Sequence, residues 1–218
     1  MKGSLNGISN LMIERYSKRY KELGYNIKTL GWGSIEQQKH RFKQAIDQIC
    51  FTEGKTILDI GCGFGDFSAL LIEEKKSFKS YTGWDINPDL IKEARNIWKN
   101  KSNQIEFEVI NIGENIATNN KFDIGIMFGV LNLNLKRKYD NYEYSKLFIK
   151  NAFSVVKDVL VVDFLSTYFV SDYPQEDFVF YHDPIKMLEF ALTLTSNVVL
   201  NHSYSPIPQK EFMLFLYK

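Results

Sequence analysis

Short, strongly apolar stretches alternate along the chain with longer segments in which apolar residues recur every three or four positions. The short stretches are rich in β-branched and aromatic residues and predict strands at 56–60, 80–85, 105–109, 122–128 and 159–164. The longer segments predict amphipathic helices with buried faces formed by Phe67, Leu70 and Leu71, by Leu90, Ile91, Ala94, Ile97 and Trp98, and by Tyr144, Leu147, Phe148, Ala152 and Val155. This alternation predicts an α/β fold with a mostly parallel, doubly wound sheet.

The last part of the chain departs from this alternation. Asp183 and Pro184 are typical of a helix start, and the helix is expected to continue to about Thr195. Two further strands are expected at 197–202 and 211–217, joined by a turn over 203–208. Two strands joined in this way predict an antiparallel pair, which would close the sheet as its sixth and seventh strands.

The first 49 residues are expected to form a separate helical segment, followed by a single domain over residues 50–218. Ser34 and Gln37 have the spacing of a capping box, which satisfies backbone amides at the start of a helix. Phe42 and Ile46 lie on the apolar side of that helix. We expect this segment to fold as a lid over a ligand bound to the main domain.

A glycine-rich turn follows the first strand and has the form D-x-G-x-G-x-G, with Asp59, Gly61, Gly63 and Gly65. Glycine tolerates unusual dihedral angles and allows a ligand to approach the backbone closely. A dinucleotide fingerprint would have glycine where Asp66 stands, and two acids beside the turn disfavour a diphosphate. They suit S-adenosylmethionine, which carries a sulfonium and an ammonium group that carboxylates attract.

This run resembles the first motif of class I S-adenosylmethionine-dependent methyltransferases, and the resemblance extends in order over about residues 50–218. It implies a Rossmann-like class I methyltransferase fold: a seven-stranded, mostly parallel sheet with helices on both faces and an antiparallel last strand. It also implies a methyltransferase that uses S-adenosylmethionine as its cofactor.

Asp85 ends the second strand, 26 positions after Asp59, and is the candidate for the ribose hydroxyls. A carboxylate accepts two hydrogen bonds from a cis-diol more strongly than asparagine or serine does. The alternative role, a helix N-cap, suits Asn87 better because Pro88 follows it. Ile86 resembles the apolar residue that lies beside adenine in the family, although an ordinary core role fits it nearly as well.

Asn111 follows the third strand, where many members of the family have an acid that accepts the adenine amino group. Asn111 keeps an amide oxygen but lacks the charge, so adenine binding is expected to be weaker or to use the backbone amide of Ile112. A plain turn residue is the alternative. The fourth strand and its loop resemble the fourth motif of the family, which places Phe128 and Asn132 near the departing methyl group. Asn132 would orient a substrate hydroxyl or, alternatively, cap the loop.

Two further residues are candidates for chemistry at the site. Arg41, on the expected lid, matches the basic residue with which family members often bind the cofactor carboxylate, and an exposed role without function is the alternative. His182 follows the loop after the fifth strand and is the first candidate for a general base, ahead of His40 and His202. A structural histidine is the default for each of the three.

Composition limits the partners. The net charge of +1, from 27 basic and 26 acidic residues, argues against nucleic acid as the main partner, because phosphate binding normally needs a basic face. No signal or membrane-spanning stretch and no metal-ligand spacing is seen, and the two cysteines form no disulfide framework. We therefore expect a cytoplasmic enzyme with a small-molecule acceptor, no nucleic acid or membrane partner and no metal; its oligomeric state stays open.

The predicted function is methyl transfer to a small polar metabolite, with oxygen ahead of nitrogen as the acceptor atom. Residues 31–34, 164–168 and 212–218 look similar to bacterial methyltransferases of surface-polysaccharide modification, which implies a capsule precursor such as a phosphoramidate. The alternatives are an NAD(P)-dependent oxidoreductase, which would share the fold, and a non-catalytic S-adenosylmethionine-binding module, which would share the glycine turn.

Overall fold

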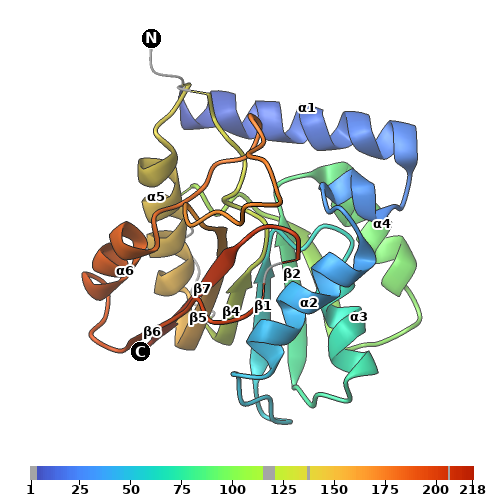
Figure 1. The fold of residues 1–218 in the computed structure, drawn as a ribbon. Coiled ribbons are helices and arrows are strands. Elements are labelled where there is room, and N and C mark those ends of the chain that lie inside the picture. The colour runs from blue at the N-terminus through green and yellow to red at the C-terminus, as the bar shows by residue number, and fades with distance from the viewer. Residues whose placement is uncertain (1–3, 115–120, 137, 206) are drawn as a thin grey trace. The chain divides into compact units, whose positions relative to one another are not determined.

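The structure is a computed structural model that describes residues 4–114, 121–136, 138–205 and 207–218 (Figure 1). Residues 1–3 of the expected lid and Pro206 of the expected last turn lie outside these ranges. The strands in the described ranges are β1 (Thr56–Ile60), β2 (Ser80–Asp85), β3 (Ile105–Val109), β4 (Phe122–Met127), β5 (Val156–Leu165), β6 (Val198–Asn201) and β7 (Glu211–Tyr217). They follow the order β3-β2-β1-β4-β5-β7-β6 in a seven-stranded sheet, which confirms the predicted fold class.

The helices are α1 (Leu5–Leu23), the 3-10 helix η1 (Ile27–Leu30), α2 (Ile35–Ile46), α3 (Asp66–Glu73), α4 (Pro88–Trp98), α5 (Asn141–Ser154) and α6 (Pro184–Leu192). None of those in the described ranges combines the length and apolar character needed to cross a bilayer.

Polar residues fix the helix starts where the sequence predicts them. The Asn87 side chain accepts hydrogen bonds from the backbone amides of Asp89 and Leu90, and Pro88 follows as the first residue of α4. Asp183 caps α6 in the same way, and Ser34 accepts a bond from the Gln37 amide at the start of α2. These three predicted starts are confirmed.

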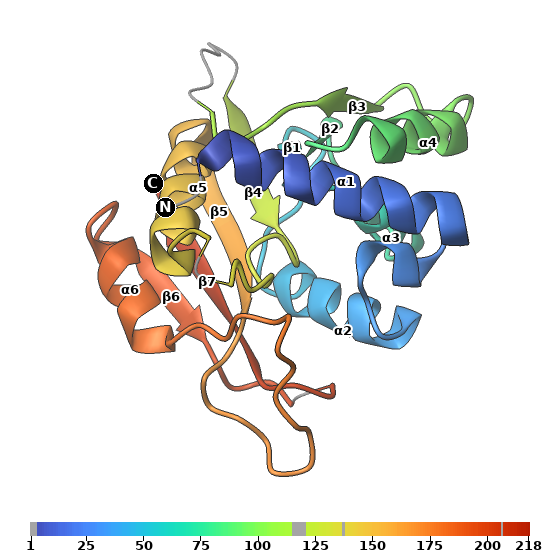
Figure 2. The same cartoon turned by 90° about the horizontal axis from the view of Figure 1, so that it is seen from above.

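Contacts group the chain into two compact units, residues 6–111 and residues 112–218 with the first few residues. The first unit contains β1, β2 and β3, which are parallel with Thr56 opposite Ser80 and Tyr81 opposite Ile105. Helix α4 packs on β2 and β3, and α2 lies beside α3 (Figure 2). Helices α1 and α2 belong to this unit, and a separate segment ending at residue 49 stays a prediction.

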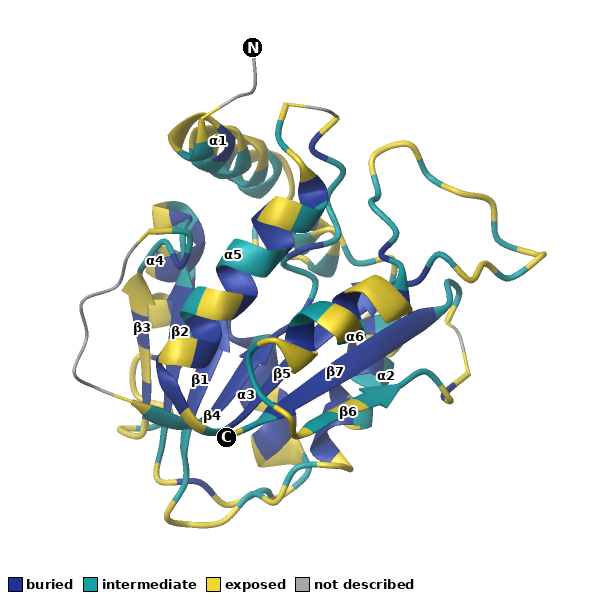
Figure 3. Cartoon of the chain, turned by 90° about the vertical axis from the view of Figure 1, so that its left-hand side faces the viewer, coloured by how far each residue is buried: buried dark blue, intermediate teal, exposed yellow. Residues whose placement is uncertain are grey.

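The second unit contains β4 and β5, which are parallel, and β7, which is antiparallel to both β5 and β6. Strand β6 therefore runs parallel to β5, and the carboxyl ends of β4, β5 and β6 lie at the same edge, where β7 begins. Helix α5 packs on β5, and α6 packs on β6 and β7, over strands β5 and β7 that are almost entirely buried (Figure 3).

Candidate active site

The glycine turn connects β1 to α3 within the first unit. The backbone φ angles of Gly61, Gly63 and Gly65 are +77°, +55° and +82°, in the left-handed region that favours glycine. The amides of Gly61 and Cys62 both donate to the carbonyl of Trp84 on β2, at 2.7 and 3.1 Å. The turn is therefore anchored to the neighbouring strand, and its conformation explains why glycine occupies these positions.

The three glycines have different surroundings. A Cβ atom on Gly63 would lie 2.8 Å from the side chain of Leu30, and one on Gly65 would lie 2.6 Å from the ring of Phe107. At these two positions the missing side chain makes room for the protein itself. Gly61 is exposed and leaves its backbone open to a ligand.

Three carboxylates, those of Asp59, Asp66 and Asp85, surround this turn. Asp85 accepts hydrogen bonds from the amides of Gly63, at 3.0 Å, and Asn87, at 2.8 Å, one on each oxygen. Asp59 is 4% exposed and accepts a bond from the hydroxyl of Tyr81. The structure therefore brings the acids predicted from the sequence together around the glycine turn.

The electrostatics of these acids favour a cation. Burial raises the pKa of Asp59 to about 7, against the lowering effect of the Tyr81 hydrogen bond, and the charges of Asp85 and Asp66 raise it further. Burial also raises the pKa of Asp85 and of Asp66. Clustered carboxylates that resist ionisation would gain from a positively charged group placed among them.

Helix α1 crosses the carboxyl ends of β2 and β3. The side-chain nitrogen Nδ2 of Asn87 donates to the Ile13 carbonyl, at 3.0 Å, and to the Ser17 hydroxyl, at 3.1 Å. Asn111, the predicted adenine contact after β3, donates to the Ser9 hydroxyl at 3.2 Å. Parts of the first unit that are distant in sequence thus meet at the edge where ligands bind in open α/β sheets.

The segment from Tyr25 to the end of α2 closes over the glycine turn from another side. Both oxygens of Asp66 are engaged, one by the Tyr25 hydroxyl at 3.2 Å and the other by the Gln38 amide at 3.0 Å. Arg41, the predicted partner of the cofactor carboxylate, is buried with its guanidinium 4.5 Å from the centre of the Trp32 ring.

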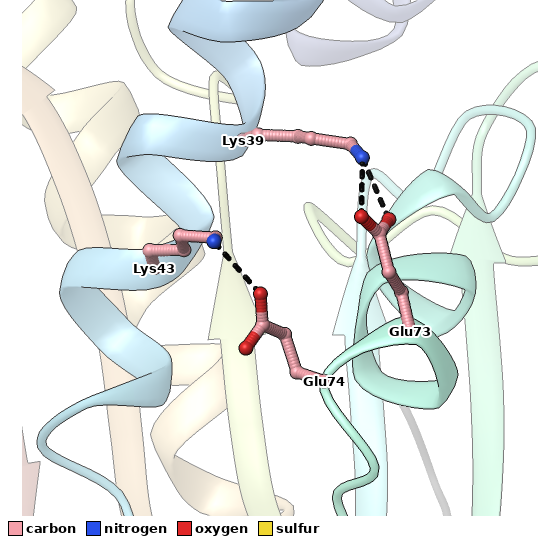
Figure 4. A network of polar contacts seen from close by, with 4 residues as sticks. All are labelled: Lys39, Lys43, Glu73 and Glu74. Atoms are coloured by element: carbon pink, nitrogen blue, oxygen red, sulfur yellow. Dashed lines mark hydrogen bonds and ion pairs between the residues drawn. The ribbon is translucent and has the colours of Figure 1, made fainter.

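Two surface ion pairs also join α2 to the end of α3. Lys39 contacts Glu73 at 2.6 Å and Lys43 contacts Glu74 at 2.7 Å (Figure 4).

Sequence reasoning missed the contacts of Leu30, Tyr25 and Gln38. The sequence did contain an indication of the contact made by Gln38, because Gln38 lies at helical spacing from the apolar residues of α2. The buried face of this helix consists of Gln38, Arg41, Phe42, Ala45 and Ile46. Polar residues on an otherwise apolar stripe indicate a polar partner beneath the helix. Leu30 and Tyr25 have no comparable signal, because their contacts depend on how η1 lies over the turn.

The remaining predicted cofactor contacts are the apolar residues Ile86, Phe128 and Ile112. Ile86 is half-buried, and Phe128 is buried at the end of β4. Ile112 is also buried, and its carbonyl accepts a hydrogen bond from Asn151 at 2.8 Å. The predicted role of the Ile112 amide stays a prediction.

Both the oxygen and the nitrogen of the Asn132 side chain have partners within the protein. Its oxygen accepts a hydrogen bond from the Leu165 amide at 3.0 Å, and its nitrogen lies 3.5 Å from an oxygen of Asp163. The other Asp163 oxygen accepts from the Gly129 amide at 2.6 Å. These contacts hold the loop after β4 to the end of β5, which is the loop-capping alternative.

The position of His182 argues against the predicted role as general base. Its side chain is fully buried among the rings of Phe164, Phe180 and Tyr142, and its Nε2 atom lies 2.9 Å from the hydroxyl of Ser145 on α5. Burial lowers the pKa of His182 to about 3. An imidazole so hard to protonate and closed to solvent belongs to the core.

The strand order, the antiparallel last strands, the glycine turn after β1 and the acid that ends β2 together define a Rossmann-like methyltransferase. The chain belongs to the methyltransferase domain family, whose model matches residues 51–174. The enzyme class predicted from the sequence is thereby confirmed. Comparison with curated proteins gives no match.

Solved structures share the fold. Magnesium protoporphyrin IX methyltransferase from Synechocystis PCC 6803, with bound S-adenosylmethionine, is 16% identical with a TM-score of 0.64, over 98% of this chain and 94% of that one. The N-methyltransferase NodS from Bradyrhizobium japonicum, in complex with S-adenosylhomocysteine, is 16% identical with a TM-score of 0.59, over 94% and 98%. Haemonchus contortus phosphoethanolamine N-methyltransferase 1 is 11% identical with a TM-score of 0.66, over 97% and 49%.

Proposed function

We propose that this protein is an S-adenosylmethionine-dependent methyltransferase that methylates a small polar metabolite, with oxygen ahead of nitrogen as the acceptor atom. The main support is the glycine turn with its three carboxylates, Asp59, Asp66 and Asp85, whose pKa values are all raised. The family and the cofactors bound by two of the structural neighbours agree with this proposal.

The residues of the turn fit this cofactor. Gly61 leaves exposed backbone beside acids that favour a cation, and S-adenosylmethionine has an ammonium and a sulfonium but no phosphate. Asp85 is held by two backbone amides, so its remaining lone pairs are fixed in direction and would accept bonds from the ribose hydroxyls. When bound, the cofactor supplies an activated methyl group on sulfur.

Other residues of the chain would complete the cofactor site. Ile86 and Phe128 would supply apolar contacts, and Asn111 and the amide of Ile112 would bind the adenine edge. Arg41 would bind the cofactor carboxylate with its planar guanidinium. In the structure this guanidinium is already oriented by the Trp32 ring, which reduces the entropy that a salt bridge would cost.

The proposed acceptor is a small molecule because the chain has almost no net charge to attract a polyanion. Within that class we place a capsule or surface-polysaccharide precursor such as a phosphoramidate first, on the resemblance of residues 31–34, 164–168 and 212–218. The protein would align the acceptor with the methyl carbon and exclude water, as an in-line displacement requires.

The proposal is tested in two stages. Calorimetric titrations with S-adenosylmethionine and with NADH are expected to show binding of the first alone. Release of S-adenosylhomocysteine is then measured with a panel of hydroxyl, amine and phosphoramidate acceptors. Exclusive binding of NADH would support the oxidoreductase. Binding of S-adenosylmethionine with no release across a broad panel would favour the non-catalytic module.

The Asp85→Asn variant is a control for the binding stage. Asparagine keeps the shape of the side chain but accepts through one oxygen and has no charge, so binding is expected to weaken without loss of the fold. Unchanged affinity would remove Asp85 from the proposed site.

A further inference from the structure

A second histidine lies at the carboxyl edge of the strands of the second unit, together with a buried serine. Ser166 follows β5 directly, and His202 follows β6 directly. The Nε2 atom of His202 lies 3.0 Å from the Ser166 hydroxyl oxygen. Because β5 and β6 run parallel on either side of β7, both residues lie at the edge where ligands bind in open α/β sheets.

Ser166 is held rigidly. It is 1% exposed, and its amide donates to the Lys210 carbonyl at 2.9 Å. Its hydroxyl oxygen accepts a hydrogen bond from the Tyr168 amide at 3.1 Å. One lone pair of that oxygen remains available, so Ser166 can accept a second bond from a ring N–H of His202.

His202 differs from His182 in its exposure. Its ring is half-buried, with its edge against the exposed ring of Tyr168 at 5.5 Å between centroids and against Phe212 at 6.1 Å. His182 is enclosed on every side by comparison. Of the two imidazoles at this edge, His202 is the one that a ligand in solution can reach.

The surroundings of His202 favour the neutral form of its ring. Burial, and then the positive charge of Lys210, lower the pKa of His202. Lys210 is itself fixed, since its ammonium donates to the Tyr204 carbonyl at 2.8 Å. The titratable group of the loop after β5 that faces the ring is Tyr168. A neutral imidazole in this setting has one ring nitrogen that can accept a proton.

We propose that His202, oriented by a hydrogen bond from its Nε2–H to the Ser166 hydroxyl, accepts the proton of the methyl acceptor at Nδ1. This inference rests on the proposed function and names the base that it lacks. The acceptor would be a hydroxyl or amine whose proton must leave. Ser166 is a positioning residue, because it holds the orientation of the ring and does not meet the substrate.

The O–H or N–H bond of the acceptor breaks, its proton passes to Nδ1, and its electron pair stays on the acceptor atom. That atom forms the new bond to the methyl carbon, and the electron pair of the carbon–sulfur bond goes to sulfur, which leaves as the thioether. The imidazolium then returns its proton to water.

The tautomer is tested without any acceptor. Long-range ¹⁵N–¹H spectra of the protein with S-adenosylhomocysteine are expected to show His202 protonated at Nε2 and unprotonated at Nδ1. In Ser166→Ala this preference is expected to weaken. A wild-type His202 protonated at Nδ1 would overturn the proposal, whichever acceptor the enzyme uses. Failure to bind S-adenosylhomocysteine at all would instead count against the proposed function.

The proton transfer is tested by measuring turnover. The substrate is the acceptor from the panel that gives the fastest release of S-adenosylhomocysteine. His202→Gln keeps an N–H at a similar reach but offers no proton-accepting nitrogen. Turnover is expected to fall by about 10²–10⁴-fold, the usual range for loss of a general base, with unchanged cofactor affinity. The limb of the pH profile due to His202 is expected to disappear, and added imidazole is expected to restore part of the turnover of His202→Gly. Turnover of His202→Gln within twofold of wild type would refute the proposal.

Discussion

Asp59 offers a test of the cofactor site that needs no acceptor. Its pKa of about 7 means that about half of the protein holds a proton on this carboxyl at neutral pH. If an ammonium or sulfonium group binds beside it, the charged form is stabilised and the pKa falls. We therefore expect binding of S-adenosylmethionine at pH 7 to release about half a proton from Asp59, and affinity to rise with pH up to about 7.

The magnitude follows from the same value. A return of the Asp59 pKa from about 7 to about 4 on binding would strengthen affinity by up to about tenfold per pH unit between those limits, which is about 4 kcal/mol in all. In the protein without cofactor, Asp59 makes folding stability change with pH in the opposite direction to cofactor affinity. The unfolded chain loses this proton near pH 4 and the folded chain near pH 7, so over that window the folded state binds more protons. The contribution of Asp59 to stability therefore falls as pH rises from about 4 to about 7 and is then constant.

The assay is calorimetry in buffers of different ionisation enthalpy, which gives the number of protons released. Asp59→Asn is expected to abolish the Asp59 share of the release. Tyr81→Phe removes the hydrogen bond that lowers the Asp59 pKa, so its release is expected to persist to higher pH. Equal release in wild type and Asp59→Asn would refute the reasoning. Equal results with S-adenosylhomocysteine would assign the effect to the ammonium, because the homocysteine compound has no sulfonium.

Three further predictions concern single residues. Asp85→Ala is expected to weaken cofactor binding by about 1–3 kcal/mol, measured by calorimetry, and unchanged affinity would contradict its role. His182→Phe leaves the buried Ser145 hydroxyl without its partner and is expected to cost about 1–3 kcal/mol in urea unfolding, while turnover of the folded fraction is kept. A large selective loss of turnover would restore His182 as a base. Glu73→Gln breaks an exposed ion pair and is expected to cost less than about 1 kcal/mol.

Much of the fold was predictable because local rules and burial agree. Strands β1, β2 and β3 have the predicted bounds, since each is a short stretch rich in β-branched or aromatic residues that is ended by a turn or a cap. Strand β5 is longer than expected, from Val156 to Leu165, because Val156 pairs with Phe122 and extends the ladder beyond its most apolar part. Helix α1 was predicted only as part of a helical segment over the first 49 residues, without its bounds, since Ile8 is its only buried residue. Its polar contacts are made with residues distant in sequence, among them Asn87, Glu93 and Asn111.

The candidate site was predictable only in part, for a different reason. Acids and glycines of the turn lie close in sequence or at strand ends, so their proximity follows from the topology of a parallel sheet. The roles of the histidines depend on burial, which sequence spacing does not give. His182 and His202 both follow segments at the same sheet edge, yet one is enclosed by three aromatic rings and the other is half-open beside Tyr168.

The hydrogen bonds of the three acids decide which of them is available to a ligand. One oxygen of Asp66 accepts a hydrogen bond from Tyr25, just before η1, and the other accepts one from Gln38 on α2, so its charge helps to hold both over the turn. Asp59 is nearly closed to solvent and acts on a ligand chiefly through its charge. Asp85 is half-exposed and is bonded by backbone amides that cannot move away. We therefore expect a ligand hydroxyl to bind at Asp85, and not at Asp59 or Asp66. The start of α4 is already capped by Asn87, so capping alone does not account for a carboxylate at the end of β2.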